Sequence, residues 1–174
     1  DSALLCLPLD YIAGKMMVVR SLVAGLKLVD VEPKGHPLAG LDADIDFAAM
    51  VPLQVYNSLQ VAQEREKLKS IRHLIIGGGP IDDSLSYELR SFPNYIWSTY
   101  GMTETLSHIA LRRLNGPQAD EWYSPLPGVR ISQDKENRLI IDAPMLCSEI
   151  LKTNDIAEFS DDNLKFKIIG RCDN

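Results

Sequence analysis

The sequence predicts an α/β fold, and two observations lead to this prediction. Between residues 4 and 115, short apolar runs typical of strands alternate with segments whose apolar residues recur at helical spacing. Such alternation is typical of βα units, in which the strands pair in parallel and helices flank the sheet. After Gly116, short apolar segments separated by polar turns replace this pattern. We therefore expect an α/β subdomain over residues 1–116 and a small β-rich, distorted barrel-like subdomain over residues 117–174.

Residues with special backbone preferences delimit the elements of the first part. Gly25 can end a helix in the left-handed conformation, Pro52 suits a first helical position, and Asp82 can cap a helix. The charged stretch at residues 64–69 is typical of an exposed surface. The predicted strands are 4–9, 26–31, 47–51, 73–76 and 95–98, and the predicted helices are 12–24, 52–61 and 82–90.

The second part opens with a stretch rich in proline. Pro117, Pro125 and the pair Pro127-Gly128 mark a linker or an irregular loop. The apolar segments behind it are short and end at polar turns, which indicates strands. These predicted strands are 129–131, 138–141, 149–152, 156–159 and 164–169.

Composition excludes several classes of protein. The chain has 174 residues, a formal net charge of −6 and 45% hydrophobic residues, and this apolar content argues against a disordered chain. The acidic balance argues against a nucleic-acid partner, because phosphate backbones require a basic surface. A small anionic ligand stays possible, since backbone N–H groups bind phosphate without net positive charge.

Neither a membrane span nor a disulfide or zinc framework is predicted. The best apolar run, residues 16–31, is interrupted by three charged residues, whereas a span needs about 20 apolar residues. The sequence opens without a basic, apolar signal peptide. Three cysteines without a C-x-x-C pair predict reduced thiols in a cytoplasmic protein: Cys6, Cys147 and Cys172.

The first group of residues that could carry chemistry follows the strand predicted at residues 73–76. Gly77-Gly78-Gly79-Pro80 allows the backbone to approach a flat or phosphorylated ligand at the carboxyl end of a parallel strand. A tight strand-to-helix turn is the commoner reason for such a run. The group is not a P-loop, because no Gly-Lys-Ser/Thr follows it.

Two further groups carry hydroxyls and charges. Residues 98–105 read STYGMTET, whose hydroxyls can bond phosphate, whose carboxylate can hold Mg²⁺ and whose ring can stack on a base. The start of a helix explains this group equally well. Residues 152–155 (KTND) and 170–174 (GRCDN) supply an Asp and an Arg that could grip ribose hydroxyls, although two hairpin turns also explain them.

The order and spacing of these groups resemble the adenylate-forming superfamily of acyl-CoA synthetases, luciferases and peptide-synthetase adenylation domains. Residues 100–104 (YGMTE) resemble its aromatic-Gly-x-Thr-Glu motif, and residues 77–80 (GGGP) resemble its Gly-Gly-Ala-Pro loop. Residues 153–155 (TND) resemble its Thr-Gly-Asp motif. Residues 170–173 (GRCD) resemble the Gly-Arg-x-Asp motif at the hinge to a mobile C-terminal lid.

Three positions depart from the superfamily pattern. Gly79 stands in place of Ala and Asn154 in place of Gly. Residues 7–14 (LPLDYIAG) resemble a Leu-Pro-Leu-x-His stretch that lines the acyl pocket, with Tyr11 in place of His. The resemblance covers residues 4–174. Within the superfamily, the stretches 8–20 and 100–116 most resemble the o-succinylbenzoate–CoA ligases of menaquinone biosynthesis.

The resemblance implies a ligase reaction in two halves. A carboxylate attacks the α-phosphate of ATP to give an acyl-adenylate and pyrophosphate, and the CoA thiol then displaces AMP. The small molecules that it implies are ATP, Mg²⁺, CoA and an aromatic carboxylic acid. It assigns Thr103 to the α-phosphate, Glu104 to Mg²⁺ and Asp173 to the pivot of the lid. The nucleotide-binding residues that it implies are Gly77, Gly78, Gly79, Pro80, Ser98, Thr99, Tyr100, Gly101, Met102, Thr103, Asp155 and Arg171.

Four residues are candidates for the acyl pocket by the same resemblance. Tyr11 would form a wall, and Lys15 could attract the second carboxylate of o-succinylbenzoate, although a solvated helix lysine is commoner. Thr105 and Ser107 either point into the pocket or start a helix.

Two parts of the superfamily pattern have no counterpart in the sequence. The Ser/Thr/Gly-rich phosphate loop would precede Leu4, and the lid with its adenylation lysine would follow Asn174. We therefore expect an incomplete, mainly parallel sheet, an exposed edge that favours a homo-oligomer, and no ligase activity from this chain alone. The alternatives are another acyl- or aryl-CoA ligase and a non-catalytic nucleotide-binding module.

Overall fold

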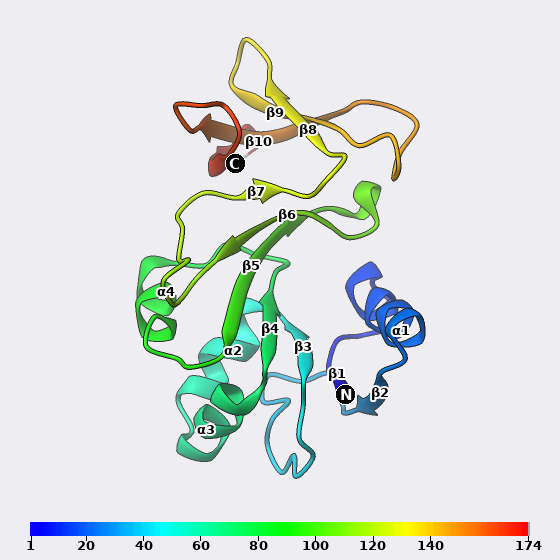
Figure 1. Cartoon of the computed structure of the whole chain (residues 1–174), viewed down its shortest axis with the longest axis vertical. Helices are drawn as coiled ribbons and strands as arrows, with labels where there is room; N and C mark the ends of the chain where they lie inside the picture. The colour runs from blue at the N-terminus through cyan, green and yellow to red at the C-terminus, as the bar shows by residue number, and fades with distance from the viewer. Residues whose placement is uncertain (174) are drawn as a thin grey trace. The chain divides into compact units, whose positions relative to one another are not determined.

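The computed structural model describes residues 1–173, which form two compact units. Unit 1 comprises Asp1–Thr99 and Arg113–Ala119, and unit 2 comprises Tyr100–Arg112 and the described residues from Asp120 onward. The chain therefore passes from one unit to the other three times. Figure 1 shows the elements of both units.

Unit 1 contains the parallel sheet that the sequence predicts. Its strands follow the order β2-β1-β3-β4-β5, and each neighbouring pair is parallel. The α/β fold class is therefore confirmed. The strands are β1 (Ser2–Leu5), β2 (Lys27–Asp30), β3 (Phe47–Met50), β4 (His73–Ile76) and β5 (Tyr95–Gly101), the last two residues of β5 belonging to unit 2.

Three helix ends in unit 1 lie where the sequence signals indicate, whereas the helix predicted over 52–61 ends at Leu59 and α3 was not predicted. Gly25 ends α1 with a left-handed backbone at φ 64°, and Pro52 is the first residue of α2. Asp82 caps α4, since its Oδ1 accepts a hydrogen bond of 2.7 Å from the Leu85 N–H. The helices are α1 (Ile12–Ala24), α2 (Pro52–Leu59), α3 (Ala62–Ser70) and α4 (Asp83–Leu89).

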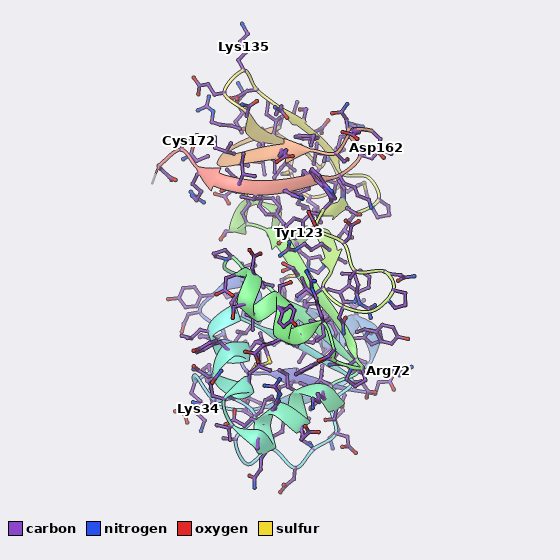
Figure 2. The ribbon with its side chains drawn as sticks, turned by 90° about the vertical axis from the view of Figure 1, so that its left-hand side faces the viewer. Lys34, Arg72, Tyr123, Lys135, Asp162 and Cys172 are labelled. Atoms are coloured by element: carbon purple, nitrogen blue, oxygen red, sulfur yellow. The ribbon has the colours of Figure 1, made fainter. Side chains whose placement is uncertain are left out.

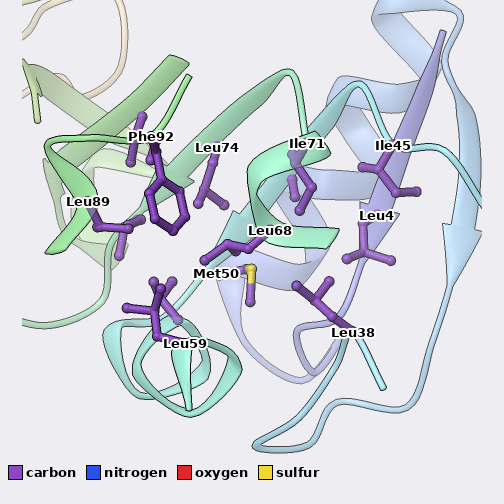
Figure 3. Close-up of a cluster of buried hydrophobic side chains, with 14 of the residues drawn as sticks. Leu4, Leu38, Ile45, Met50, Leu59, Leu68, Ile71, Leu74, Leu89 and Phe92 are labelled. Atoms are coloured by element: carbon purple, nitrogen blue, oxygen red, sulfur yellow. The ribbon is translucent and has the colours of Figure 1, made fainter. Parts of the chain in front are cut away.

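Alternate residues of each strand fill two different cores of unit 1. Residues such as Leu4, Met50 and Leu74 face the side on which α2, α3 and α4 pack, and Figure 3 shows Leu68 of α3 beside Met50. On the opposite face, a smaller cluster packs against α1; its buried members are Ala3, Leu5, Leu7, Met17 and Ala49. A sheet with helices on both faces follows from this two-residue alternation.

Two further predictions for unit 1 are wrong in detail. The first strand covers Ser2–Leu5 rather than residues 4–9. The charged stretch 64–69 lies in α3 and is not exposed throughout, because Glu64 is only 5% exposed. Its carboxylate accepts a hydrogen bond of 3.1 Å from Ser58 Oγ and lies 3.0 Å from His36 Nδ1. These partners compensate the cost of burying the charge.

Unit 2 is β-rich, as predicted, and contains a curled antiparallel sheet in the order β11-β10-β9-β8. Lys135 lies at the turn between β8 and β9, and Asp162 lies at the turn between β10 and β11 (Figure 2). A further antiparallel pair joins β6 and β7. The strands are β6 (His108–Arg113), β7 (Ser124–Pro125), β8 (Arg130–Gln133), β9 (Arg138–Asp142), β10 (Leu151–Phe159) and β11 (Phe166–Arg171), the last residue of β6 belonging to unit 1.

The structure corrects the strand assignment in unit 2. The segments 149–152 and 156–159, predicted as two strands, are one strand, β10, whose pairing with β9 shifts register between Lys152 and Ile156. The strands β6 and β7 were not predicted. Ile109 and Ala110 of β6 are fully buried in the core of unit 2 together with Leu139, Ile141 and Phe166.

The segment 100–112 belongs to unit 2, whereas the division at residues 116 and 117 groups it with the first part. Tyr100, Met102, Ile109 and Ala110 of this segment pack in the core of unit 2, and the sequence alone did not indicate that packing.

No helix within residues 1–173 is both long and apolar enough to cross a membrane. Asn174, the final residue of the predicted second subdomain, lies outside the described residues.

Candidate functional site

Three segments of unit 2 bring together Tyr100, Asp155 and Arg171. Tyr100 lies near the end of β5, and Asp155 of β10 pairs directly with Arg171 of antiparallel β11. The Tyr100 hydroxyl donates a hydrogen bond of 2.5 Å to Asp155 Oδ2, and Arg171 Nη1 donates one of 3.2 Å to Asp155 Oδ1. The sequence predicts these three residues for one nucleotide site, and the structure places them in direct contact.

Aromatic packing holds the Tyr100 ring in place. The ring meets Phe166 edge-on, with centroids 5.3 Å apart, and is tilted against Tyr123 at 6.0 Å. Figure 2 labels Tyr123, which also pairs with Phe166 in an isolated β-bridge. These two partners were not predicted as site residues.

The electrostatics of the cluster favour a neutral phenol at Tyr100. Burial and the hydrogen bond to Asp155 raise the pKa of Tyr100 well above its ordinary value. The hydrogen bond to Asp173, together with the charges of Asp155 and Asp173, raises the pKa of Arg171. Asp155 is 8% exposed, so its carboxylate is a nearly buried acceptor with an adjacent permanent cation.

Asp173 is fixed by two neighbours at the end of β11. Arg171 Nε and Nη2 each donate a hydrogen bond of 2.9 Å to the two oxygens of Asp173, a bidentate pair. This guanidinium lowers the pKa of the Asp173 carboxyl. Asn154 Nδ2 donates a further hydrogen bond of 3.3 Å to Asp173 Oδ2. The departure from Gly at residue 154 therefore adds a side-chain contact to the predicted hinge residue.

Thr153 supports Asp155 from within the same strand. Its hydroxyl oxygen accepts a hydrogen bond of 3.1 Å from the Asp155 N–H and donates one of 2.8 Å to the Leu139 carbonyl. Thr153 is 7% exposed, so this bond is shielded from water. The residue was not predicted as a site residue, although it opens the TND motif that could have indicated it.

Thr103 and Glu104 lie in a short 3₁₀ turn, Thr103–Thr105, directly after β5. Both side chains are exposed and able to meet a ligand, whereas Thr105 is fully buried. Within residues 1–173, no group of three His, Cys, Asp or Glu side chains gathers to hold a metal ion. A single carboxylate still fits Mg²⁺, because this ion commonly combines one or two carboxylates with phosphate oxygens.

In unit 1, the loop Gly77-Gly78-Gly79-Pro80 follows β4. Its first residue lies so close to Thr99 that a Cβ at Gly77 would be 2.1 Å from the Thr99 hydroxyl oxygen. Gly78 adopts φ 79°, which favours glycine, and its two successors are exposed. The Thr99 hydroxyl donates a hydrogen bond of 3.4 Å to the Ile76 carbonyl. Thr99 therefore supports the loop from the neighbouring strand.

The predicted acyl-pocket residues differ in exposure. Tyr11 is 69% exposed just before α1, and Lys15 is an exposed residue of that helix. Ser107 is half-buried in unit 2. Thr105 is 0% exposed, and its hydroxyl bonds to backbone groups of its own turn. Thr105 is the last residue of the 3₁₀ turn, and its assignment to the acyl pocket stays a prediction. Ser98, predicted for the nucleotide, is only 1% exposed in β5.

The profile of the family described as AMP-binding enzyme matches residues 1–142. The chain belongs to this AMP-binding enzyme family. The match includes the loop at residues 77–80 and the turn at residues 102–105, and it ends before β10.

Curated proteins named 2-succinylbenzoate–CoA ligase are similar to the chain at low identity. The 2-succinylbenzoate–CoA ligase of Escherichia coli is 28% identical over 189 residues, a match that covers 100% of the chain and 40% of that enzyme. The enzyme of the same name from Salmonella typhimurium is 29% identical over 133 residues, covering 75% of the chain and 27% of the relative. The chain thus spans less than half the length of these relatives.

Solved structures share the fold. An acyl-CoA synthetase (AMP-forming)/AMP-acid ligase II-like protein from Dyadobacter fermentans superposes with a TM-score of 0.88 at 38% identity, covering 99% of the chain and 49% of that protein. Escherichia coli MenE, solved with an m-phenylether-linked analogue of OSB-AMS, gives 0.80 at 25% identity, covering 100% and 40%. The Bacillus subtilis o-succinylbenzoate CoA synthetase in complex with ATP and magnesium gives 0.77 at 18% identity, covering 98% and 42%, and shows the fold alone.

Proposed function

We propose that the chain is the nucleotide-holding part of an AMP-forming acid–CoA ligase whose acid is o-succinylbenzoate. The observation that carries the nucleotide role is the contact of Tyr100, Asp155 and Arg171 in one cluster. The names of the curated relatives support the acid, and the shared fold of the solved acyl-CoA synthetase supports the reaction class.

The proposal gives a chemical task to three residues of unit 2, namely Asp155, Tyr100 and Thr103. Asp155 accepts hydrogen bonds from ribose hydroxyls, because a carboxylate held by Tyr100 and Arg171 still has free lone pairs. The ring of Tyr100 packs against the adenine. Thr103 donates its hydroxyl proton to an oxygen of the α-phosphate, where negative charge grows during attack.

Glu104 would hold Mg²⁺ through its exposed carboxylate, together with phosphate oxygens of ATP. The ion, when bound, neutralises charge on the phosphates and on the departing pyrophosphate. The oxygen of the acid forms a bond to the α-phosphorus as the bond to pyrophosphate breaks. In the second half-reaction the CoA sulfur bonds to the acyl carbon, and AMP leaves.

The remaining predicted residues carry smaller parts of the proposal. The loop at residues 77–80 would bound the adenine through exposed backbone, and Tyr11 and Lys15 would contact the acid. Asp173 would act as the pivot of a lid. Three free cysteines agree with a cytoplasmic enzyme, and burial raises the pKa of the Cys6 thiol to about 12, which keeps it protonated and unreactive.

The complete gene product that contains this chain provides the test. Thioester formation with ATP and CoA is measured for o-succinylbenzoate, benzoate, a coumarate-like acid and medium-chain fatty acids. We expect a strong preference for o-succinylbenzoate and a loss of at least ~100-fold in Glu104→Gln, because a neutral amide is a poor ligand for Mg²⁺.

The other outcomes separate the alternatives. Turnover of a different acid would retain the ligase and reject the proposed substrate. Binding of ATP without turnover of any acid would favour a non-catalytic nucleotide-binding module. Thioester formation by the 174-residue chain alone would contradict the assignment of this chain to a part of the enzyme.

A further inference from the structure

The buried hydroxyl of Thr105 organises the turn that follows β5. Its oxygen accepts a hydrogen bond of 3.1 Å from the Met102 N–H, as the third residue of a helical turn does in a capping box. The same hydroxyl lies 2.7 Å from the Ser107 carbonyl oxygen and 3.0 Å from the Met102 carbonyl oxygen. One side chain therefore joins the start and the end of the turn.

The segment that this hydroxyl holds is under strain. Leu106 adopts φ 61°, a left-handed backbone that a residue with a Cβ rarely adopts. The Leu106 side chain is 50% exposed, so its own burial contributes little to holding this conformation. The hydrogen bond from Thr105 to Ser107 spans this strained residue directly.

Close packing against Gly101 fixes the returning strand from the other side. A Cβ at Gly101 would lie 2.5 Å from the Ser107 carbonyl oxygen and 2.6 Å from the His108 Cα. The Ser107 carbonyl is thus confined between the backbone at Gly101 and the hydroxyl of Thr105.

Because the turn is closed in this way, the side chains of the two residues before Thr105 point toward solvent. Thr103 and Glu104 are exposed, while Thr105 is completely buried. Their backbone lies inside the loop closed between Met102 and Ser107, so the position of both side chains depends on that closure.

We infer that Thr105 is a positioning residue for the reaction rather than part of the acyl pocket. Its hydroxyl holds the Thr103 hydroxyl and the Glu104 carboxylate in the geometry that a metal-bound triphosphate requires. The inference rests on the proposed function and adds to it the residue on which the alignment of those two groups depends.

The test compares Thr105→Val, which keeps the shape but lacks the hydroxyl, with the conservative Thr105→Ser in the complete protein. Kinetic constants for ATP and for the acid are measured together with ATP affinity by calorimetry, with and without Mg²⁺. Because small misplacements of reacting groups cost up to about 100-fold, we expect kcat/KM for ATP to fall ~10- to 100-fold in Thr105→Val. Thr105→Ser should stay within about threefold of the wild type, and KM for the acid should not change.

Calorimetry gives a readout that does not require turnover. We expect Mg²⁺ to strengthen ATP binding in the wild type and in Thr105→Ser, and to do so far less in Thr105→Val. If Thr105→Val does not fold, the double variant with Leu106→Gly replaces it, since glycine adopts the left-handed conformation without strain.

Unchanged ATP kinetics and unchanged Mg²⁺ dependence in Thr105→Val would overturn the inference. A change confined to KM for the acid would also overturn it and would restore Thr105 to the acyl pocket. Failure of the wild type to form an adenylate or a thioester with any acid is a separate result, which would reject the proposed function itself.

Discussion

Asp155 shows how one buried residue depends on residues distant in sequence. Its two carboxylate oxygens accept hydrogen bonds from Tyr100 and Arg171, and its N–H donates to Thr153. A carboxylate that is 8% exposed would be costly without such partners. The same partners orient it, which suits a group proposed to bind ribose.

The first prediction concerns the Tyr100 hydroxyl. Tyr100→Phe keeps the ring that packs against Phe166 and removes the donor to Asp155. We expect the free energy of unfolding to fall by about 1–2 kcal/mol, because a hydrogen bond to a charged group is lost while Arg171 remains as a donor. Chemical denaturation measures this, and the affinity of the complete protein for ATP should fall in parallel. Equal stability and equal affinity would show that Asp155 does not depend on this bond.

The raised pKa of Tyr100 also predicts that the stabilisation lost in Tyr100→Phe depends on pH. Burial and Asp155 raise the pKa of Tyr100 above its ordinary value near ~10, so the folded state favours the neutral phenol. The stabilisation from Tyr100 is fully present below pH ~10 and is lost as the pH rises above that value. The difference in unfolding free energy between wild type and Tyr100→Phe should therefore shrink above pH ~10. A constant difference from pH 8 to 11 would contradict the assignment.

The glycine loop offers a matched pair of substitutions. In Gly77→Ala, the new Cβ would be 2.1 Å from the Thr99 hydroxyl oxygen, whereas in Gly79→Ala it would meet only Pro52 carbons at 3.7 and 3.8 Å. We expect Gly77→Ala to cost about 1–3 kcal/mol of stability and Gly79→Ala to be neutral or to add up to about 1 kcal/mol. Thermal unfolding of both variants checks this. Rescue of Gly77→Ala by Thr99→Ala would identify the clash as the cause.

At the scale of elements, Asn115 ties the start of β5 to the segment that returns to unit 1. Asn115 is 1% exposed, and its Nδ2 donates hydrogen bonds of 2.9 and 2.8 Å to the carbonyls of Phe92 and Asn94. Its Oδ1 accepts from the Ile96 N–H at 3.2 Å and from Arg113 Nε at 2.9 Å. Asn115 thus makes four hydrogen bonds through one buried amide, all to residues of unit 1.

Asn115→Ala tests this junction. The substitution leaves buried carbonyl and N–H groups without partners, so we expect a loss of about 3 kcal/mol or more in the free energy of unfolding. Asn57→Ala is the control, because Asn57 makes one such bond, of 3.1 Å to the Gly35 carbonyl, and should cost about 1 kcal/mol or less. Similar losses in both variants, measured by denaturant titration, would show that the junction does not depend on Asn115.

Strand β10 illustrates why element boundaries were partly mispredicted. The polar residues Thr153, Asn154 and Asp155 indicate a turn between two strands, because turns favour such residues. In the structure these side chains are satisfied within one strand. Thr153 donates to the Leu139 carbonyl of β9 and Asn154 to Asp173 just after β11. Asp155 accepts from Tyr100 and from Arg171 of β11. The information that makes them compatible with a strand comes from neighbours far along the chain.

At the scale of the whole molecule, the two units are interleaved in sequence. Unit 2 needs residues 100–112, since Ile109 and Ala110 are buried in its core and Tyr100 and Met102 pack against it. We predict that a peptide of residues 117–174 does not fold alone, because that core would lose one wall. Circular dichroism and amide hydrogen exchange would check this. A cooperative unfolding transition for the peptide would support the division at residue 116.

The predicted self-association of the chain has a surface on which it can be tested, the outer face of α1. Leu22 and Val23 are 77% and 84% exposed, and β2 is the edge strand of the sheet of unit 1. We expect the isolated chain to associate at high concentration and Leu22→Glu to shift it toward the monomer. Light scattering measures both, and an unchanged monomer for the wild-type chain would refute the prediction.

The sequence by itself determined the α/β class, the helix ends at Gly25, Pro52 and Asp82, and the motifs that indicate a nucleotide. These features depend on local signals, namely apolar periodicity, capping residues and short motifs, which act over a few residues. Only the tertiary structure decided that Thr105 is buried and that Asn154 contacts Asp173. It also decided which strands share a core. Burial and long-range hydrogen bonds depend on residues that are distant in sequence, and local sequence signals do not identify these residues.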